Sequence, residues 1–365
     1  MKILNILFVC VVVCTCCTTF CFAQLAGDKD KALVSGVARL YNRIPGNLEP
    51  EELLQKVNEV DWQVKLKIDS LSSEEMKAKA NLLRYNGWLW RFGDCMAKTG
   101  DQQMRSVLTE RIADLNLDSP DLELLSDVEI MNLVNGYCRV FMPNASSLEK
   151  ATYVLYNIKS EKVRNSYVLS ALVAAFKKSG YTGDVQELLD DIELCSKTES
   201  TIQKARELRE KYYPVRAGEP APDFEMEDEN GKLVKLSDFK GKAVFIDVWA
   251  TWCGGCIAGL PAFMALREQY KDRKDMVFLT ISDDGIKAKA RWLNFLKEKK
   301  YTGRIPHLII NDEKDQFKEN YCITGIPRYI LIDKEGKIVN AWHLGAKDEL
   351  FSWAFTMELE NMNRK

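Results

Sequence analysis

The sequence predicts two domains of different class, an all-α array of helices followed by an α/β domain. The first observation is that residues 24–213 carry apolar side chains at helical spacing, with short breaks between segments. The second is a group of three prolines, Pro214, Pro220 and Pro222, which cannot continue a helix. The third is that short apolar runs alternate with helical segments after these prolines. We therefore expect one domain over 24–213 and another over 214–365.

Residues 1–23 have the pattern of a secretory signal peptide. Lys2 gives a positive start, an apolar run follows, and Cys21-Phe22-Ala23 is a small-residue cleavage signal. The apolar run is shorter than the roughly 20 residues that a membrane-spanning helix needs. We expect export to the periplasm of a bacterium, with a retained N-terminal membrane anchor as the alternative.

The first domain is expected to consist of helices joined by short turns. Residues 60–68 also alternate in polarity, which fits a strand, so this part stays ambiguous. Four aromatic residues at helical spacing indicate packing between helices, with a peptide-binding groove as the alternative; they are Tyr85, Trp88, Trp90 and Phe92. The expected helices are 29–43, 51 onward, 73–92, 102–115, 120–141, 147–158, 161–178, 183–195 and 200–212.

The second domain is expected to form a mixed sheet with helices on both faces. Two hairpins are predicted, at 224–236 and 329–341, because strand-like runs flank turn residues in each. The other expected strands are 244–249, 276–281 and 307–310, and the expected helices are 257–270, 286–300 and 347–360.

A Trp-Cys-Gly-Gly-Cys motif at residues 252–256 lies between a predicted buried strand and a predicted helix. Two cysteines separated by two residues can form a reversible disulfide. The N-terminus of the helix carries partial positive charge, which favours a thiolate there. We therefore expect Cys253 to be the nucleophile and Cys256 the resolving thiol.

The motif has two alternative interpretations, a zinc site and a static disulfide. A zinc site normally needs a second Cys or His pair, and the chain has only His307 and His343 and, beyond the expected signal peptide, no second C-x-x-C. A static disulfide is disfavoured because so short a ring suits a labile bond.

The net charge is −2 and no basic tract appears, so nucleic acid is not an expected partner. Four more cysteines are expected to be buried apolar residues, with a bridge among the first three left open: Cys95, Cys138, Cys195 and Cys322.

Several motifs of the second half together resemble those of the TlpA/ResA-like exported thiol–disulfide oxidoreductases. These motifs lie at residues 220–224, 236–242, 247–256 and 325–333. The helical domain is similar to those of exported proteins from Bacteroidetes-type bacteria. The resemblance implies a thioredoxin-like fold for the second domain, with a redox-active Cys253–Cys256 disulfide and no other cofactor.

The resemblance also implies roles for four residues near the motif. Pro327 stands for the family's cis-proline, next to which the backbone of Ile326 pairs with a substrate strand; an ordinary trans proline is the alternative. Asp247 stands for a buried carboxylate of raised pKa that takes the proton of the resolving thiol; a partly exposed, hydrogen-bonded aspartate is the alternative. Trp252 is expected to shield the disulfide and offer an apolar contact surface. The chain departs from the family at Gly259, where many relatives carry a glutamate, so that acid–base role is absent.

The expected function is reduction of disulfides in exported protein substrates, with electrons supplied by a membrane thiol carrier, as the resemblance implies. One alternative is a disulfide oxidase or isomerase on the same fold. A peroxidase is another, although Ala250 and Ile246 stand where peroxiredoxins need threonine and proline. A third is a non-enzymatic protein that binds a partner through its helical domain.

Overall fold

The computed structural model describes residues 28–311 and 316–364, so the expected signal peptide at 1–23 lies outside the described residues. Two compact units are present. The first contains the described residues up to Ala171 together with Cys195–Thr198. The second contains Leu172–Leu194 and the described residues from Glu199 onward. Within the described ranges, no helix has the length and apolar character needed to span a bilayer.

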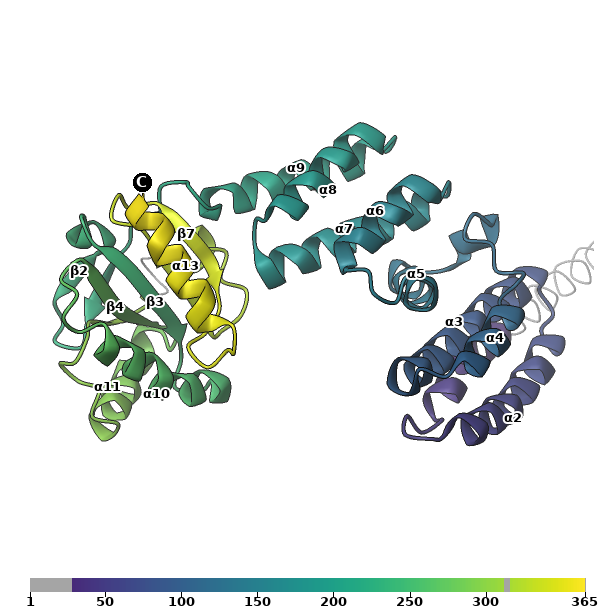
Figure 1. Ribbon diagram of the computed structural model, residues 1–365. Coiled ribbons are helices and arrows are strands. Elements are labelled where there is room, and N and C mark those ends of the chain that lie inside the picture. The colour runs from purple at the N-terminus through teal and green to yellow at the C-terminus, as the bar shows by residue number, and fades with distance from the viewer. Residues whose placement is uncertain (1–27, 312–315, 365) are drawn as a thin grey trace, which may run out of the picture. The chain divides into compact units, whose positions relative to one another are not determined.

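The first unit is built from helices (Figure 1). The ambiguous stretch 60–68 is helical, because the helical face at Leu53, Val57, Val64 and Ile68 is buried while Trp62 is 65% exposed. The described helices after the helical residues 28–42 are α2 (Pro50–Asp69), α3 (Glu74–Thr99), α4 (Gln102–Arg111), a 3-10 helix (Pro120–Leu124), α5 (Asp127–Phe141), α6 (Ser147–Asn157) and the first part of α7 (Glu161–Ser179).

The single helix predicted over 120–141 is wrong. Leu125 adopts an extended conformation, with φ −86° and ψ 147°, and separates the 3-10 helix from α5. Ser126 caps α5 by accepting a hydrogen bond from the N–H of Glu129, whose carboxylate accepts one from the N–H of Ser126. This capping box satisfies two donors that a helix start leaves unpaired, so α5 begins after it.

The aromatic group of α3 is mostly packed between helices. Trp88 and Phe92 are buried, whereas Trp90 is 48% exposed. Trp88 Nε1 donates to Asp61, which also accepts hydrogen bonds from Arg84 and from Tyr41. Packing is therefore confirmed for Trp88 and Phe92, and the half-buried ion pair between Arg84 and Asp61 accompanies it.

The second unit contains a seven-stranded mixed sheet in the order β2-β1-β5-β4-β3-β6-β7. Its strands are β1 (Glu225–Asp228), β2 (Leu233–Lys235), β3 (Ala243–Trp249), β4 (Met276–Ser282), β5 (His307–Ile309), β6 (Arg328–Ile332) and β7 (Ile338–His343). β3 pairs in parallel with β4 and antiparallel with β6, and all seven of its residues are buried. This gives the thioredoxin-like α/β fold, in which β3 is an interior strand between β4 and β6.

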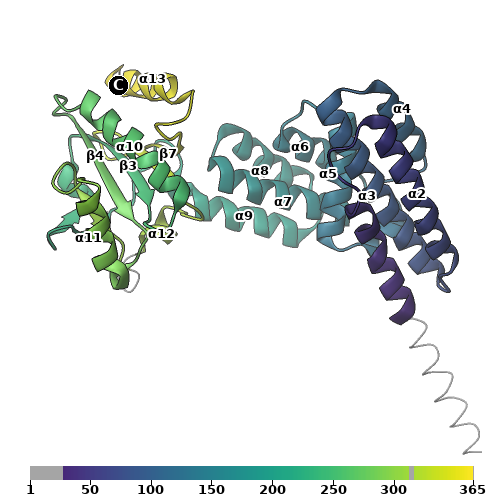
Figure 2. The ribbon, with the colours of Figure 1, turned by 90° about the horizontal axis from the view of Figure 1, so that it is seen from below.

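Helices cover both faces of this sheet, with α11 and α13 on opposite sides of β3 and β4 (Figure 2). One apolar cluster joins the sheet to α10 and α13 and includes Phe245, Phe263 and Phe355. The predicted first residues of two helices were wrong. A 3-10 turn at 286–288 precedes α11, and the closing helix starts at Phe351, not at 347. The helices are α10 (Gly254–Gln269), α11 (Lys289–Glu298), α12 (Phe317–Asn320) and α13 (Phe351–Arg364).

The second unit also includes the end of α7, most of α8 (Gly183–Cys195) and α9 (Glu199–Tyr212). Trp342 of β7 donates from Nε1 to the Lys177 carbonyl, at 3.3 Å, and its ring lies 6.0 Å from that of Tyr212. Cys322 Sγ lies 3.4 Å from the carbonyl oxygen of Lys211. The unit therefore begins on the N-terminal side of the boundary expected between 213 and 214, because these contacts join α7 and α9 to the sheet.

Gly180, in the turn between α7 and α8, supports a stability prediction. It has φ +70°, and a Cβ there would lie 2.2 Å from the Trp342 ring. We expect Gly180→Ala to cost about 1–3 kcal/mol more than Gly231→Ala, because only the former adds overpacking to left-handed backbone strain. Gly231 is the matched control, since it has φ +81° and no atom within 4 Å of the added Cβ. Urea unfolding measures both, and equal losses would contradict the contact with Trp342.

Candidate active site

The end of β3 and the start of α10 position the two cysteines of the motif. Cys253 is the N-cap of α10, and its Sγ accepts a hydrogen bond of 3.2 Å from the N–H of Cys256. Since the first N–H groups of a helix lack intrahelical acceptors, this position stabilises negative charge on the sulfur. Local structure alone thus favours a thiolate at Cys253.

The two cysteines form a disulfide with a Cα–Cα distance of 5.2 Å. They differ in access, because Cys253 is half-buried and Cys256 is completely buried. Trp252, immediately before them, is 60% exposed. An external disulfide can therefore reach Cys253 but not Cys256, and Trp252 offers an apolar surface beside the point of contact.

The loop before β6 faces the disulfide. The Ile326–Pro327 peptide bond is cis, and the Ile326 carbonyl oxygen lies 3.8 Å from Cys253 Sγ. Pro327 is exposed and Ile326 is half-buried. The structure thus brings Ile326 next to the sulfur of Cys253, while Pro327 lies 3.9 Å from a Cβ built on Gly255 of the motif.

Asp247 lies in the middle of β3, paired in register with Thr280 on one side and Tyr329 on the other. Its side chain is completely buried, and neither carboxylate oxygen has a hydrogen-bond partner. Burial raises the pKa of Asp247 well above its ordinary value, because the charged form is penalised in an apolar environment. It is not the partly exposed, hydrogen-bonded aspartate of the alternative.

Tyr329 is a site residue that the sequence reasoning missed. A Cβ added to Gly259 would lie 2.8 Å from the Tyr329 hydroxyl, so this phenol occupies the space beside Gly259. Burial raises the pKa of Tyr329, and the nearby Asp247 carboxylate raises it further. The sequence held one signal for this role: Tyr329 follows Pro327 by two residues, at the start of the strand β6 that pairs with β3.

Asp284 is the second missed residue, and it holds the segment that leads into the motif. It accepts hydrogen bonds from the N–H of Thr251 at 2.8 Å and from the Ser282 hydroxyl at 2.7 Å, and it pairs with Arg291. Burial by itself would raise the pKa of Asp284, but these hydrogen bonds outweigh it and the pKa is lowered. The parallel pairing of β3 and β4 could have indicated this contact, because it brings the loop after β3, with Thr251, next to the loop after β4, with Asp284.

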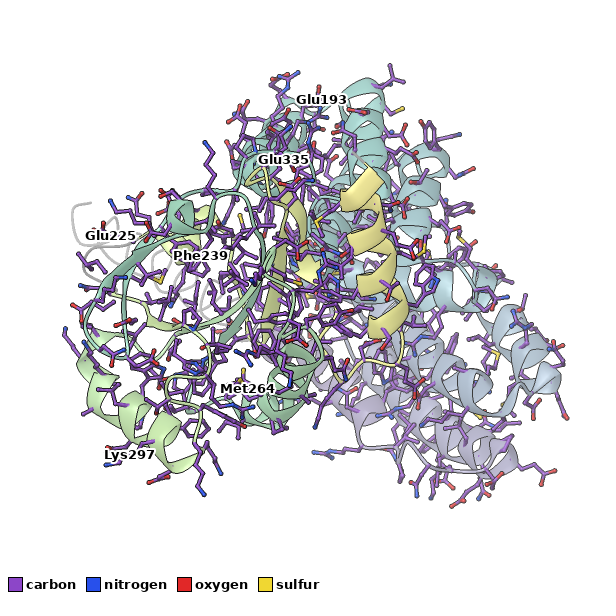
Figure 3. All side chains as sticks on the ribbon, turned by 60° about the vertical axis from the view of Figure 1, so that its left-hand side comes forward. Glu193, Glu225, Phe239, Met264, Lys297 and Glu335 are labelled. Carbon is purple, nitrogen blue, oxygen red and sulfur yellow. A yellow bond between two sulfur atoms is a disulfide. The ribbon has the colours of Figure 1, made fainter. Side chains whose placement is uncertain are left out.

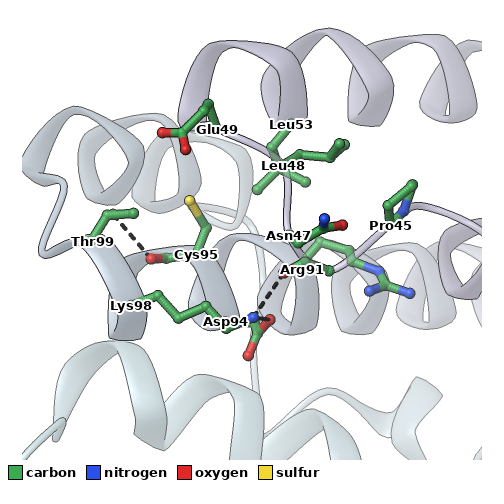
Figure 4. Close-up of a pocket in the computed structure, with 11 residues that line it drawn as sticks. Pro45, Asn47, Leu48, Glu49, Leu53, Arg91, Asp94, Cys95, Lys98 and Thr99 are labelled. Carbon is green, nitrogen blue, oxygen red and sulfur yellow. Dashed lines mark hydrogen bonds and ion pairs between the residues drawn. The ribbon is translucent and has the colours of Figure 1, made fainter.

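The four other cysteines of the described residues are unpaired, with Cys95, Cys138 and Cys322 buried and Cys195 half-buried. Cys95 lines a cavity of about 160 Å³ in the first unit, beside Asp94 and Lys98, which form an ion pair (Figure 4). Burial raises the pKa of Cys95, so its thiol is poorly suited to nucleophilic attack. Over residues 28–311 and 316–364, no group of three or more potential metal ligands is present.

Comparison with known proteins gives four matches. Residues 216–349 match the Redoxin family model. The chain is 31% identical over 147 residues to the thiol-disulfide oxidoreductase ResA of Bacillus thuringiensis subsp. konkukian, covering 40% of this chain and 79% of that protein. It is 36% identical over 125 residues to ResA of Bacillus subtilis, covering 34% and 66% respectively. A crystal structure of a putative thiol-disulfide oxidoreductase from Bacteroides vulgatus is 40% identical, with a TM-score of 0.35, covering 40% of this chain and 97% of that one.

Proposed function

Because the chain belongs to the family of ResA-like thiol–disulfide oxidoreductases, we propose that it reduces disulfides in exported proteins through Cys253 and Cys256. The observation that carries this proposal is the unequal access of the two sulfurs. Cys253 is half-buried at a helix N-terminus, and Cys256 is completely buried behind it. This arrangement suits one thiol that attacks a substrate and a second that completes the exchange.

The reaction proceeds in two exchanges. The Cys253 thiolate attacks one sulfur of the substrate disulfide, forming a mixed disulfide and releasing the other substrate sulfur as a thiolate. Cys256, once deprotonated, attacks Cys253 Sγ, which breaks the mixed disulfide and releases the second substrate thiolate. The substrate gains two electrons, and the protein is left with the Cys253–Cys256 disulfide.

Substrate contacts are proposed at the exposed rim of the site. The Ile326 backbone lies next to the reacting sulfur and is placed to pair with an extended substrate segment. Trp252 supplies apolar contact area, being 60% exposed. Asp247 is assigned to accept the proton from Cys256, because burial raises its pKa and makes its carboxylate a stronger base than an exposed one.

Export and the direction of electron flow are also proposals. The signal-peptide pattern of residues 1–23 supports a periplasmic location, with anchoring in the membrane as the variant form. Reduction is the direction proposed, because an oxidising compartment already forms disulfides. A thiol carrier in the membrane would then return the protein to its dithiol form.

The reduction potential of Cys253–Cys256 tests the direction. The protein is equilibrated in glutathione or dithiothreitol buffers, and the fraction of free thiol is read by alkylation and mass spectrometry. A value of roughly −250 mV or below supports a reductase, and a value near −150 mV would indicate an oxidase or isomerase. The Cys253→Ser/Cys256→Ser double variant, which cannot form the disulfide, gives the background from Cys95, Cys138, Cys195 and Cys322.

A further inference from the structure

A cavity of about 410 Å³ lies beside the cis-proline loop. Ile326, Pro327 and Arg328 form one side of it, and Trp342 of β7 forms another. Lys177 and Lys178, at the end of α7, complete the lining, and all of these residues belong to the second unit. The cavity is therefore continuous with the loop that contacts Cys253.

Arg328 is a buried cation in the wall of this cavity. Its side chain is only 6% exposed, and its guanidinium stacks over the Trp342 ring at 4.1 Å from the centroid. The one hydrogen bond that its guanidinium makes to a described residue runs from Nη1 to the carbonyl oxygen of Ala341, at 3.3 Å. Among the described residues no carboxylate forms an ion pair with Arg328. A buried charge without a counterion is costly, so this position calls for an anion from outside.

The rest of the lining adds positive charge and no negative charge. Lys177 and Lys178 are exposed, and no acidic residue lines the cavity. Glu358 does not line the cavity; its carboxylate lies 2.9 Å from Nε2 of the lining residue His343 and accepts a hydrogen bond from Asn340. The cavity is thus a cationic recess that the chain itself leaves uncompensated.

We propose that this recess binds a carboxylate side chain of the substrate polypeptide, close in sequence to the disulfide that is reduced. The proposal rests on the proposed function and names its substrate class, acidic segments next to a disulfide. The recess and the reacting sulfur share a neighbour, because Ile326 lines the recess and its carbonyl oxygen is 3.8 Å from Cys253 Sγ. An extended segment rises about 3.3 Å per residue, so a side chain a few residues from the substrate cysteine reaches the recess. Arg328 would then hold the carboxylate by charge-assisted hydrogen bonds.

The test compares two disulfide peptides with blocked termini, identical except that one has Glu and the other Gln two residues on either side of a cysteine. We expect kcat/KM to be about tenfold higher for the Glu peptide at low salt, and the preference to shrink as salt is added. Arg328→Gln should abolish most of the preference, and Arg328→Lys should keep part of it. Lys177→Gln with Lys178→Gln should lower it about threefold while leaving the core intact.

The control is a pair of exposed lysines that do not line the recess, Lys271 and Lys297, the latter on α11 (Figure 3). Replacing both with glutamine makes the same change in net charge, so the preference should persist. Equal kcat/KM for the two peptides with the unmodified protein would overturn the inference. A third peptide, with Gln side chains and a free C-terminal carboxylate, distinguishes a chain terminus from a side chain as the bound group; preference for it over the Glu peptide would also overturn the inference.

Binding separates this inference from the proposed function. Peptides in which the cysteines are replaced by serine cannot react, and their affinity is measured by calorimetry. Tighter binding of the Glu form, lost in Arg328→Gln, supports the recess even if no peptide disulfide is reduced, an outcome that would overturn only the proposed reductase. Equal affinity together with normal reduction would overturn only the recess.

Discussion

The Cys256→Ser variant is expected to stop after the first exchange and to accumulate a mixed disulfide through Cys253. The buried Cys256 thiol is held next to Cys253 Sγ, so its attack is intramolecular. Removing it leaves only external thiols to release the product, and turnover should fall by at least about a thousandfold. Mass spectrometry under non-reducing conditions should detect one substrate molecule per protein, joined through Cys253.

Two further variants control this experiment. Cys253→Ser should form no adduct, because Cys256 is completely buried. Cys322→Ser should turn over normally, since that buried thiol is directed at the carbonyl oxygen of Lys211. An adduct that maps to Cys256 would reverse the roles assigned to the two cysteines.

The Asp247→Asn variant is expected to slow the second exchange by about a hundredfold, the range of general acid–base catalysis. Its carboxylate has no hydrogen-bond partner, and burial raises its pKa. An amide cannot accept the proton of Cys256, so release from the mixed disulfide should lose the pH dependence that Asp247 supplies. Stopped-flow measurement of product release against pH tests this, and an unchanged profile would exclude Asp247 as the base.

The same substitution should change how stability varies with pH. Since the pKa of Asp247 is raised in the folded protein, the folded state binds a proton that the unfolded state releases above about pH 3.9. Stability should therefore fall as pH rises from there through the folded pKa, by up to about 1.4 kcal/mol per pH unit, and Asp247→Asn should remove this decline.

Asp275→Asn is the control, because folding lowers the pKa of Asp275 whereas it raises the pKa of Asp247. The hydrogen bond from Arg273 lowers the pKa of Asp275, so its contribution to stability is present at neutral pH and is lost in acid. Urea unfolding from pH 4 to 8 should thus show a pH-dependent gain for Asp247→Asn and no gain for Asp275→Asn. A gain that is constant over this range would contradict a raised pKa at Asp247.

The sequence by itself determined the elements whose signals are local. The strand–motif–helix order fixed Cys253 at a helix N-terminus, because an apolar strand directly precedes the motif. The same apolar run required Asp247 to be buried, as every neighbour in β3 is buried. The capping box at Ser126 was also readable from the chain, yet helical periodicity on both sides concealed it.

Only the tertiary structure decided which distant residues meet at the site. Tyr329 occupies the space beside Gly259 through β3–β6 pairing, and Arg328 stacks on Trp342 through β6–β7 pairing. Lys177 joins the recess because Trp342 bonds to its carbonyl, 165 residues away in the chain. Periodicity records which face of an element is buried but not which partner covers it, so these contacts had no local signal. The roles of Cys253 and Cys256 could therefore be predicted from the sequence, whereas the positive charge of Arg328 and Lys177 near them depends on tertiary packing.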